Sequence, residues 1–429
     1  MLTFTPDGSM VVVACEGEPD DDYAVDPEGS VVLIDTSNGY SDSMEVTIID
    51  FQAYDGKEDS LRSEGIRIFG PNATASQDME PEYIVVSEDS TTAVVALQEN
   101  NALVQIDLES KTITAIKPLG FKDHSAEGNE FDASNKDGGI NITSWPTLGM
   151  YQPDGMVGFV IDGKQYYATA NEGDSRDYDG YSEEGRVKDL TLAQSFFDLN
   201  ANIQENEYMG RLKTTFANGD EDGDGIYETV YSYGARSFSI FDADLTMIYD
   251  SGSALEDITA SVIPDDFNSN NDENDSMDSR SDDKGPEPEA VVFAAIGEHS
   301  YLFVMLERVS GIAVFIVDDP TEPIFEQYLH SRIFDGVAAE GTAGDLGPES
   351  GVFIPAADSP TDDALLVVAN EVSGTTTIYK VAEVVPTSAP TSAPTAAPAP
   401  APTSSSAALW KGPLIVVLFA FSSFLVNTM

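Results

Sequence analysis

Cysteine, histidine and basic residues are scarce in this chain of 429 residues, and each shortage excludes a class of site. The single cysteine, Cys15, rules out an intrachain disulfide and a cysteine-based zinc site. It lies in an apolar, β-branched run, and we expect it to be a small buried residue. The three histidines, His124, His299 and His330, are scattered. Few candidates therefore exist for a histidine metal site or a Ser-His-Asp triad.

Three common enzyme signatures are also missing. The sequence contains no GxSxG elbow, no Walker A loop and no Rossmann glycine fingerprint. Lys and Arg number 20 against 76 Asp and Glu, which gives a formal charge of −56. Such a surface repels nucleic acid, which we therefore do not expect as a partner. The acidity has two interpretations, which are solubility in a salty extracellular medium and binding of several cations.

The chain is rich in a repeated acidic phrase. A Pro-Asp or Pro-Glu pair precedes an apolar strand, and an acidic turn follows the next strand. The opening acids are Asp7, Glu82, Asp154, Glu289 and Glu349, and the turn acids are Glu16, Glu99, Glu172, Glu307 and Glu371. Short β-branched runs between Gly, Asp and Asn turns predict strands. Their repetition predicts an all-β fold, a β-propeller over residues 1–384.

About six blade-like units can be counted, at roughly 1–50, 80–120, 150–215, 226–262, 287–330 and 348–384. A seven-bladed ring needs one more. The chain enters its first strand without a leader peptide, which predicts a truncated N-terminus. A pair of β-sandwiches is the alternative, which the regular repeat disfavours. Two polar segments interrupt the units, 122–145 and 265–284, and we expect the second to be a solvated loop.

The composition changes after the predicted propeller. Residues 385–403 are rich in Pro, Thr and Ala and predict an extended stalk. Residues 404–429 place the small residues Ser404, Ser405 and Ser406 before a spacer and a short apolar run, which is typical of a GPI-attachment signal. A single C-terminal transmembrane segment is the alternative, although the run is shorter than the about 20 residues that span a bilayer. Either anchor predicts the extracellular face of the plasma membrane.

Three sequons, at Asn72, Asn141 and Asn274, are candidate glycosylation sites and fit passage through the secretory pathway.

The sharpest local motif is the acidic segment 220–228. Asp220, Asp222 and Asp224 occupy positions 1, 3 and 5, a glycine at position 6 permits a sharp turn, and Glu228 adds an oxygen at position 9. Ca²⁺ accepts such flexible, all-oxygen coordination, so the motif predicts a calcium site. It is not a full EF-hand, because position 12 is a tyrosine. An acidic turn without a metal ion is the alternative.

The repeat predicts a second metal site. The innermost strand of each blade borders the central channel, so the opening acids are expected to form a ring at one end of it: Asp7, Glu82, Asp154, Glu289 and Glu349. Like charges this close cannot all ionise without a compensating cation, which predicts bound Ca²⁺ or another hard ion. Acids that only cap turns within their own blades are the alternative.

Basic residues gather at one place in the repeat. Arg280 and Lys284 lie among four acids that include Glu287 and Glu289, and Arg236 occupies a comparable place in the preceding unit. The three cations predict either a site for phosphate oxygens beside a metal ion or simple balance of the neighbouring carboxylates.

Several longer phrases together carry a family resemblance. They are Asp-Met-Glu-Pro-Glu-Tyr at 78–83, Asn-Glu-Gly-Asp-Ser-Arg-Asp-Tyr at 171–178 and Ser-Asp-Asp-Lys-Gly-Pro-Glu-Pro-Glu at 281–289, among others. Over residues 1–384 the chain resembles the choice-of-anchor I family, which includes a mesenchyme-specific cell-surface glycoprotein of skeleton-forming cells and bacterial alkaline phosphatase-like relatives. The resemblance implies a secreted or surface propeller with a variable anchor, sequence upstream of residue 4, and an association with biomineralisation and calcium handling. The acidic repeats are distantly similar to calcium-dependent propeller phytases.

Three hypotheses follow. The first is a membrane-anchored extracellular calcium-binding glycoprotein that acts in cation handling, matrix or mineral assembly. The second is a calcium-dependent phosphoesterase for phosphate esters, with a metal-bound water as the nucleophile and Glu287, Glu289, Arg236, Arg280 and Lys284 as candidate residues. The third is an adhesion module that uses calcium only for rigidity.

Overall fold

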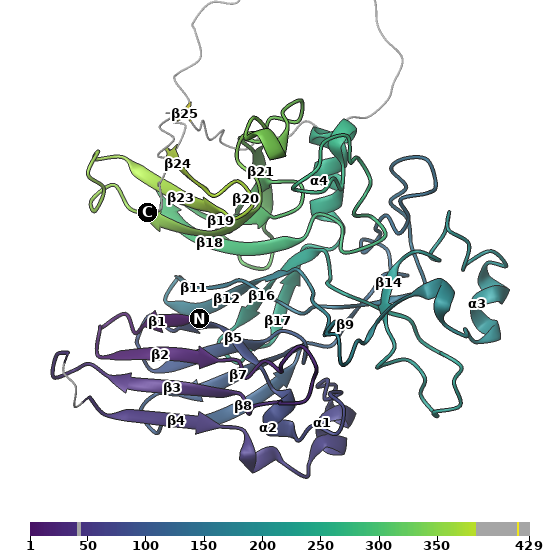
Figure 1. Cartoon of the computed structure of the whole chain (residues 1–429). Helices are drawn as coiled ribbons and strands as arrows, with labels where there is room; N and C mark the ends of the chain where they lie inside the picture. Colours follow the sequence, from purple (N-terminus) through teal and green to yellow (C-terminus); the bar gives the residue numbers. More distant parts are fainter. Residues whose placement is uncertain (41–43, 383–417, 420–429) are drawn as a thin grey trace, which may run out of the picture.

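The computed structural model describes residues 1–40, 44–382 and 418–419, and most of its regular structure is antiparallel β-sheet (Figure 1). Five sheets have four strands each. The first sheet contains β1 (Leu2–Phe4), β2 (Met10–Cys15), β3 (Ser30–Asp35) and β4 (Val46–Asp50). The second contains β5 (Pro81–Val86), β6 (Thr92–Leu97), β7 (Ala102–Asp107) and β8 (Thr112–Pro118). The third contains β11 (Met156–Ile161), β12 (Lys164–Asn171), β16 (Ser237–Asp242) and β17 (Met247–Asp250). The fourth contains β18 (Pro288–Ile296), β19 (His299–Leu306), β20 (Gly311–Ile316) and β21 (Ile324–Leu329). The fifth contains β22 (Pro348–Ile354), β23 (Ala364–Asn370), β24 (Thr375–Val381) and β25 (Leu418–Phe419).

The sheets stack face to face because their strands are apolar on both sides. In β6, Ala93, Val95 and Leu97 pack into the core shared with the first sheet. Val94 and Ala96, which point the other way, pack against the third sheet. Successive side chains of a strand alternate between its faces, so a continuous apolar run suits a strand that is covered on both sides.

The first strands of the five sheets lie next to one another in chain order, from β1 through β5, β11 and β18 to β22. The sheets fan outward from this common axis (Figure 1). Sequential antiparallel sheets around an axis are the architecture of a β-propeller, so the predicted fold class is confirmed.

The number of units differs from the prediction. The stretches 150–215 and 226–262 do not form two blades, because β12 pairs directly with β16 from Tyr166↔Asp242 to Asn171↔Ser237. The chain leaves the sheet after β12 and returns to it at β16, so the described part of the chain has five four-stranded sheets rather than six blade-like units. A closed seven-bladed ring remains a prediction.

A small lobe interrupts the third sheet and has a core of its own. Trp145, Phe196, Met209 and Leu212 are all buried within it. Its sheets are β9 (Phe121–Asp123), β10 (Leu148–Met150) and β15 (Tyr231–Ser232), and the pair β13 (Glu184–Arg186) and β14 (Lys213–Thr215). The α-helices of the described residues are α1 (Glu58–Glu64), α2 (Ala75–Asp78), α3 (Gln194–Leu199) and α4 (Ala254–Val262), with 3₁₀-helices at Gln52–Tyr54, Val187–Asp189, Pro264–Asp266 and Ala338–Glu340. None of the described helices has the length and apolar character needed to cross a membrane.

The segment 265–284 is only in part the solvated loop that was expected. Phe267, Asn268 and Ser281 are completely buried, and Asp282 is 2% exposed. The segment packs between the lobe and the fourth sheet, where its acids find basic partners such as Arg186, which lies 2.9 Å from Asp282. Asp272, Glu273 and Asp275 of the same segment are exposed, so only part of its charge is engaged in ion pairs.

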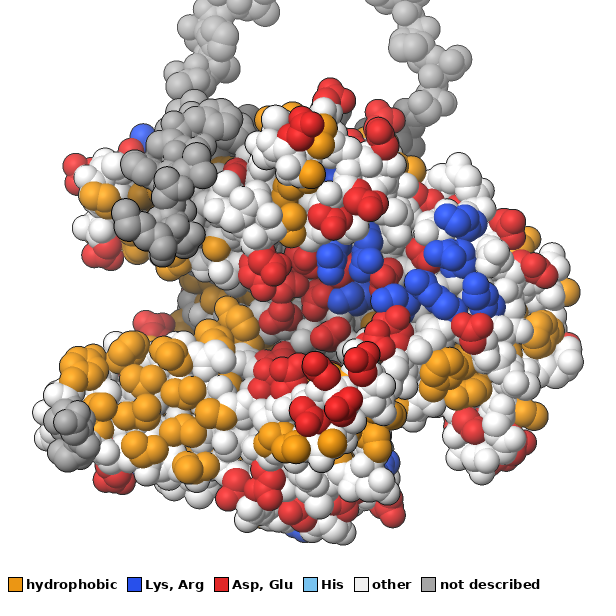
Figure 2. Space-filling view, viewed as in Figure 1, with side chains coloured by type: hydrophobic (Ala, Val, Ile, Leu, Met, Phe, Trp, Pro, Cys, Tyr) orange, Lys and Arg blue, Asp and Glu red, His pale blue; other side chains and the backbone are white. Residues whose placement is uncertain are grey.

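Cys15 is exposed, which corrects the expectation of a buried thiol. The two outermost sheets of the series each leave one apolar face open, as Figure 2 shows for the first sheet. Leu2 and Ile48 are 59% and 64% exposed there, and Val352 is 54% exposed on the fifth sheet. Cys15 shares strand parity with Val11 and Val13, so its side chain points to the open face of the first sheet.

Several predictions concern chemistry at the surface or at the C-terminus. Asn72 and Asn141 are exposed and Asn274 is half-buried, and glycosylation remains a prediction at all three. The predicted stalk at 385–403 and the predicted lipid-attachment residues Ser404, Ser405 and Ser406 lie outside the described residues, as does most of 404–429.

Candidate functional site

The opening acids are positioned by an irregularity that recurs at the start of the inner strands. β5, β18 and β22 each begin with proline, and Glu82, Glu289 and Glu349 come next. At each of these places the pairing register with the second strand shifts. Proline has no N–H to donate to the ladder, and a bulge turns the following side chain in a new direction. The repeated Pro-Glu pair thus turns three carboxylates toward the axis.

The turn acids meet the opening acids because antiparallel pairing brings the end of the second strand beside the start of the first. Pro81 lies opposite Leu97, and Pro288 lies opposite Leu306. Glu99 and Glu307 follow shortly after those leucines, so their side chains approach the same end of the axis as Glu82 and Glu289.

Carboxylates from neighbouring sheets converge into three clusters at this end of the axis. Within each cluster one oxygen of every acid lies within 4.8 Å of the others. We call them the first cluster (Glu16, Glu82, Glu99), the second cluster (Asp154, Glu172, Glu289) and the third cluster (Glu172, Glu287, Glu307). Figure 2 shows acidic side chains gathered in the hollow at the centre of the molecule, with basic side chains to one side.

A close backbone approach joins two blades at the second cluster. The Gly155 N–H donates a hydrogen bond of 2.9 Å to the Glu289 carbonyl oxygen. A Cβ atom at position 155 would lie 2.5 Å from that oxygen, so only glycine allows the contact. Asp154, the residue before this glycine, is thereby held beside Glu289.

Asp7 does not join these clusters, which corrects its assignment to the ring. It lies in the turn between β1 and β2, at the other end of the strands, and its N–H donates to Ser90 Oγ at 3.1 Å. Its Pro-Asp pair follows the inner strand instead of preceding it. Hydrogen bonds from Thr5 and Ser9 lower the pKa of the exposed Asp7 carboxyl to about 2.

The first cluster contains one buried carboxylate, Glu99, and two half-buried ones. Burial, together with Glu99 and Asp154, raises the pKa of Glu82 well above its ordinary value. Burial also raises the pKa of Glu99 to about 7, although Arg176 opposes the change. Glu99 is 7% exposed, and its Oε2 has no hydrogen-bond partner among the described residues. Within the described chain no Lys or Arg forms an ion pair with these three acids.

The second cluster also contains carboxylates that no Lys or Arg of the described chain neutralises. Burial raises the pKa of Glu289 far above its ordinary range, and Glu172 and Asp154 raise it further. In the part of the chain that the structure describes, neither Asp154 nor Glu289 has a Lys or Arg ion pair, and only Glu172 contacts a cation, Lys284. A proton or a metal ion must therefore offset the remaining charge.

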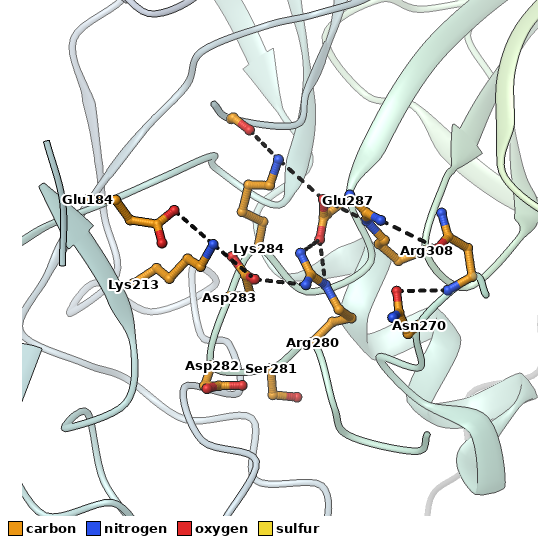
Figure 3. Close-up of polar contacts among 12 residues, drawn as sticks. Glu184, Lys213, Asn270, Arg280, Ser281, Asp282, Asp283, Lys284, Glu287 and Arg308 are labelled. Atoms are coloured by element: carbon orange, nitrogen blue, oxygen red, sulfur yellow. Dashed lines mark hydrogen bonds and ion pairs between the residues drawn. The ribbon is translucent and has the colours of Figure 1, made fainter. Parts of the chain in front are cut away.

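The third cluster is neutralised by protein side chains, as Figure 3 shows. Glu287 is completely buried and lies 2.5 Å from Arg280, 3.0 Å from Arg308 and 3.2 Å from Lys284. Burial alone would raise the pKa of Glu287, but these three cations together lower it well below its usual range. Two of the predicted cations, Arg280 and Lys284, are thus brought to the axis and engaged by Glu287.

Arg236 is not brought to the carboxylate clusters. It is 4% exposed, and its guanidinium donates at 2.6 Å to Glu256 and at 2.8 Å to the carbonyl oxygens of Asp132, Ser281 and Asp283. These contacts tie segment 122–145 to segment 265–284 and α4.

Glu349 forms a separate pair with Glu371. Burial and the nearby Glu371 carboxyl together raise the pKa of Glu349 to about 7. This pair belongs to the fifth sheet alone, and Glu349 stands in none of the three clusters.

The Asp220 loop lies in the lobe, away from the axis. Oxygens of Asp220, Asp222 and Asp224 converge within 4.8 Å of one another, as the motif predicted. The Asp220 carboxylate also accepts backbone hydrogen bonds from Gly223 and Gly225, both at 2.9 Å. Glu228 instead accepts from the Glu221 N–H at 3.1 Å. Both the calcium site and the acidic turn fit this geometry, and calcium here remains a prediction.

Sequence reasoning missed two residues that shape the site. Arg308, directly after the turn acid Glu307, contacts both Glu287 and Glu307. Arg176 pairs with Asp78 at 2.5 Å and with Glu80 at 2.7 Å beside the first cluster. Arg176 belongs to the phrase at 171–178, but its acidic partners Asp78 and Glu80 lie about a hundred residues away in the sequence. No local sequence pattern connects Arg176 with these two acids.

Comparison with known proteins places this geometry in a family. The choice-of-anchor I domain model matches residues 1–320. Gigasin-3a of Magallana gigas is 34% identical over 190 residues, which cover 42% of this chain and 66% of that protein. The mesenchyme-specific cell surface glycoprotein of Strongylocentrotus purpuratus is 25% identical over 301 residues, which cover 62% of this chain and 38% of that protein. The chain thus spans less than two thirds of the length of either relative.

Solved structures with a similar arrangement have little sequence in common with the chain. The periplasmic gluconolactonase of Pseudomonas aeruginosa matches with 14% identity and a TM-score of 0.36, over 88% of this chain and 65% of that chain. The β-propeller domain of Cps50 (Swd1) from Myceliophteria thermophila matches with 11% identity and a TM-score of 0.29, over 88% and 82%. The family model covers well over half of the sequence, and the chain belongs to the choice-of-anchor I family.

Proposed function

We propose that this protein is an extracellular calcium-binding glycoprotein of the cell surface, and that its propeller axis holds the ions. The observation that carries the proposal is the first cluster, in which three carboxylates converge within 4.8 Å and one buried Glu99 oxygen lacks a partner in the described structure. A buried carboxylate without a hydrogen bond or a cation is costly, so the cluster requires a proton or a metal ion.

The donor atoms favour calcium over other common metal ions. The first and second clusters consist of carboxylates alone, whereas zinc sites use mainly cysteine and histidine. Ca²⁺ accepts six to eight oxygens in a flexible arrangement, and water can complete a shell that begins with three carboxylates. Mg²⁺ requires a stricter octahedral geometry, so we expect it to bind more weakly.

The cell-surface part of the proposal draws on the family. One relative is by name a cell surface glycoprotein, and two of the three sequons here are exposed. A GPI anchor at residues 404–429, or a transmembrane segment in its place, would hold the propeller outside the membrane. There it would handle cations or contribute to a matrix or a mineral.

The test is the number of calcium ions bound by the purified full chain, measured by equilibrium dialysis and titration calorimetry after chelator treatment. Glu82→Gln should lose one ion relative to wild type, because it removes a charged ligand of the first cluster. Asp222→Ala shows separately whether the Asp220 loop in the lobe binds one of the counted ions. The matched control is Glu207→Gln, at an exposed acid. If wild type and Glu82→Gln bind the same number of ions, the axis does not hold calcium as proposed.

The phosphoesterase hypothesis has less support from the geometry. Arg280 and Lys284 lie beside the second cluster, as a phosphate site would require, but Glu287 engages both of them. Arg236 is committed to carbonyl groups and Glu256. The adhesion hypothesis stays open as a further prediction.

A further inference from the structure

The third cluster has the same carboxylate geometry as the other two but a different occupant. Oxygens of Glu172, Glu287 and Glu307 lie within 4.8 Å of one another, so by this measure alone the axis could hold a third metal ion. The Lys284 ammonium already lies between two of these acids. Its Nζ contacts Glu172 and lies 3.2 Å from Glu287.

The ammonium is bound as a cation in a site is bound. Besides the two carboxylates, its Nζ donates at 2.6 Å to the Gly173 carbonyl oxygen. Three oxygens thus surround a group that has three N–H donors.

The oxygens of Glu287 are also fully used. Its Oε1 accepts from Arg280, and its Oε2 accepts from Arg308 at 3.0 Å and lies 3.2 Å from Lys284. Arg308 also lies 3.2 Å from Glu307. Three carboxylates therefore face three cationic side chains, whereas no Lys or Arg in the described structure pairs with the first cluster.

The loop that carries Lys284 is built to hold it there. Arg280 pairs with Asp283 at 2.8 Å, and the Gly285 N–H donates to the Arg280 carbonyl oxygen at 2.9 Å. Glu287 adopts a positive φ of 52°, which an L residue rarely does without support. The loop closes on itself on both sides of Lys284 and aims its side chain at Glu172, which is 112 residues away in the sequence.

We propose that Lys284 is a built-in counter-ion that takes the place of a metal ion in the third cluster, and that the three clusters therefore hold two metal ions rather than three. The inference rests on the proposed function and deepens it, because it assigns one cluster to a side chain and the other two to ions. Since Glu172 belongs to both the second and the third cluster, Lys284 also borders the second metal site.

A first experiment locates the ions in the unmodified protein. Crystals of the full chain are soaked in Tb³⁺, a calcium substitute, and its anomalous density is mapped. We expect peaks in the first and second clusters and none in the third. A peak among Glu172, Glu287 and Glu307 would overturn the inference. The absence of any peak at the axis would instead refute the proposed function.

A second experiment counts ions in Lys284→Met, which keeps the unbranched side chain and removes the charge. We expect it to bind one calcium ion more than wild type, because the third cluster loses one of its three cations and keeps all of its carboxylates. Lys284→Arg, which keeps the charge, should bind the same number as wild type. If Lys284→Met binds the same number of ions or fewer, Lys284 does not substitute for a metal ion, and the inference fails.

Discussion

The substitution Glu289→Gln tests whether Glu289 is a metal ligand or only a structural residue. If it is a ligand, the change in the free energy of unfolding should depend on calcium. Burial, Glu172 and Asp154 raise the pKa of Glu289 far above its ordinary range. Without a metal ion its carboxyl is therefore neutral at pH 7.5. A glutamine amide has the same size and is also neutral, so the substitution should change the free energy of unfolding in chelator by no more than about 1 kcal/mol.

In calcium the same substitution should be costly. A ligand that binds only the native state stabilises it by RT ln(1 + [L]/Kd), which is about 2.7 kcal/mol when the free ligand is at 100 times its Kd. Glu289→Gln replaces a charged ligand of the second cluster with a neutral one. At that calcium concentration it should lose most of this amount, and the loss should grow with the logarithm of the calcium concentration.

The assay is urea unfolding followed by circular dichroism, with each variant measured in EGTA and in calcium. Glu207→Gln, at an exposed acid, should respond to calcium as wild type does. Two results would refute the reasoning. An equal loss of stability in EGTA and in calcium would make Glu289 a structural residue, and an undiminished response to calcium would remove Glu289 from the metal site.

Three further predictions follow from the same geometry. Burial raises the pKa of Glu99 from 4.5 to about 7, so the folded chain without calcium binds protons more tightly than the unfolded chain. Its stability should then fall as the pH rises from about 4.5 through 7, while the stabilisation by calcium grows; melting temperatures at pH 5 and pH 8, with and without EGTA, check both trends. Arg176→Met leaves two buried acids unpaired and should destabilise the protein by about 3 to 5 kcal/mol, measured by urea unfolding, whereas Arg62→Met at an exposed ion pair should cost less than about 1 kcal/mol. The full chain should not hydrolyse p-nitrophenyl phosphate or phytate, because Glu287 engages its axial cations; calcium-dependent turnover that disappears in Glu289→Gln would establish the phosphoesterase hypothesis instead.

The clustering of the acids could be predicted from sequence because it depends on local strand geometry. A Pro-Glu pair at the start of one strand and an acid after the next strand must meet when the two strands form a hairpin. The rule holds for Glu82 with Glu99, and it fails for Asp7, whose Pro-Asp pair follows β1. Asp7 also belongs to a Pro-Asp pair, but this pair comes after the inner strand β1 instead of before it. Because β1 is very short, the sequence did not indicate that it precedes the pair.

The number of blades could not be predicted in the same way, because it depends on a pairing between distant strands. Most of the lobe is formed by the chain between β12 and β16, and the two flanks of this excursion resemble separate units. Only the pairing of Ala168 with Ile240 shows that these flanks are strands of one sheet.

The distribution of positive charge gives the strongest reason to expect ions at specific clusters rather than a diffuse acidic surface. The chain has only 20 Lys and Arg residues for 76 acids, and three of these cations surround the single carboxylate Glu287. In the described structure no Lys or Arg pairs with the first cluster, although one of its acids, Glu99, is also buried. A fold that needed only neutral acids for stability could have distributed its cations evenly among the clusters. Their concentration at Glu287 leaves two clusters whose charge an external cation can offset, and these are the two where we expect calcium.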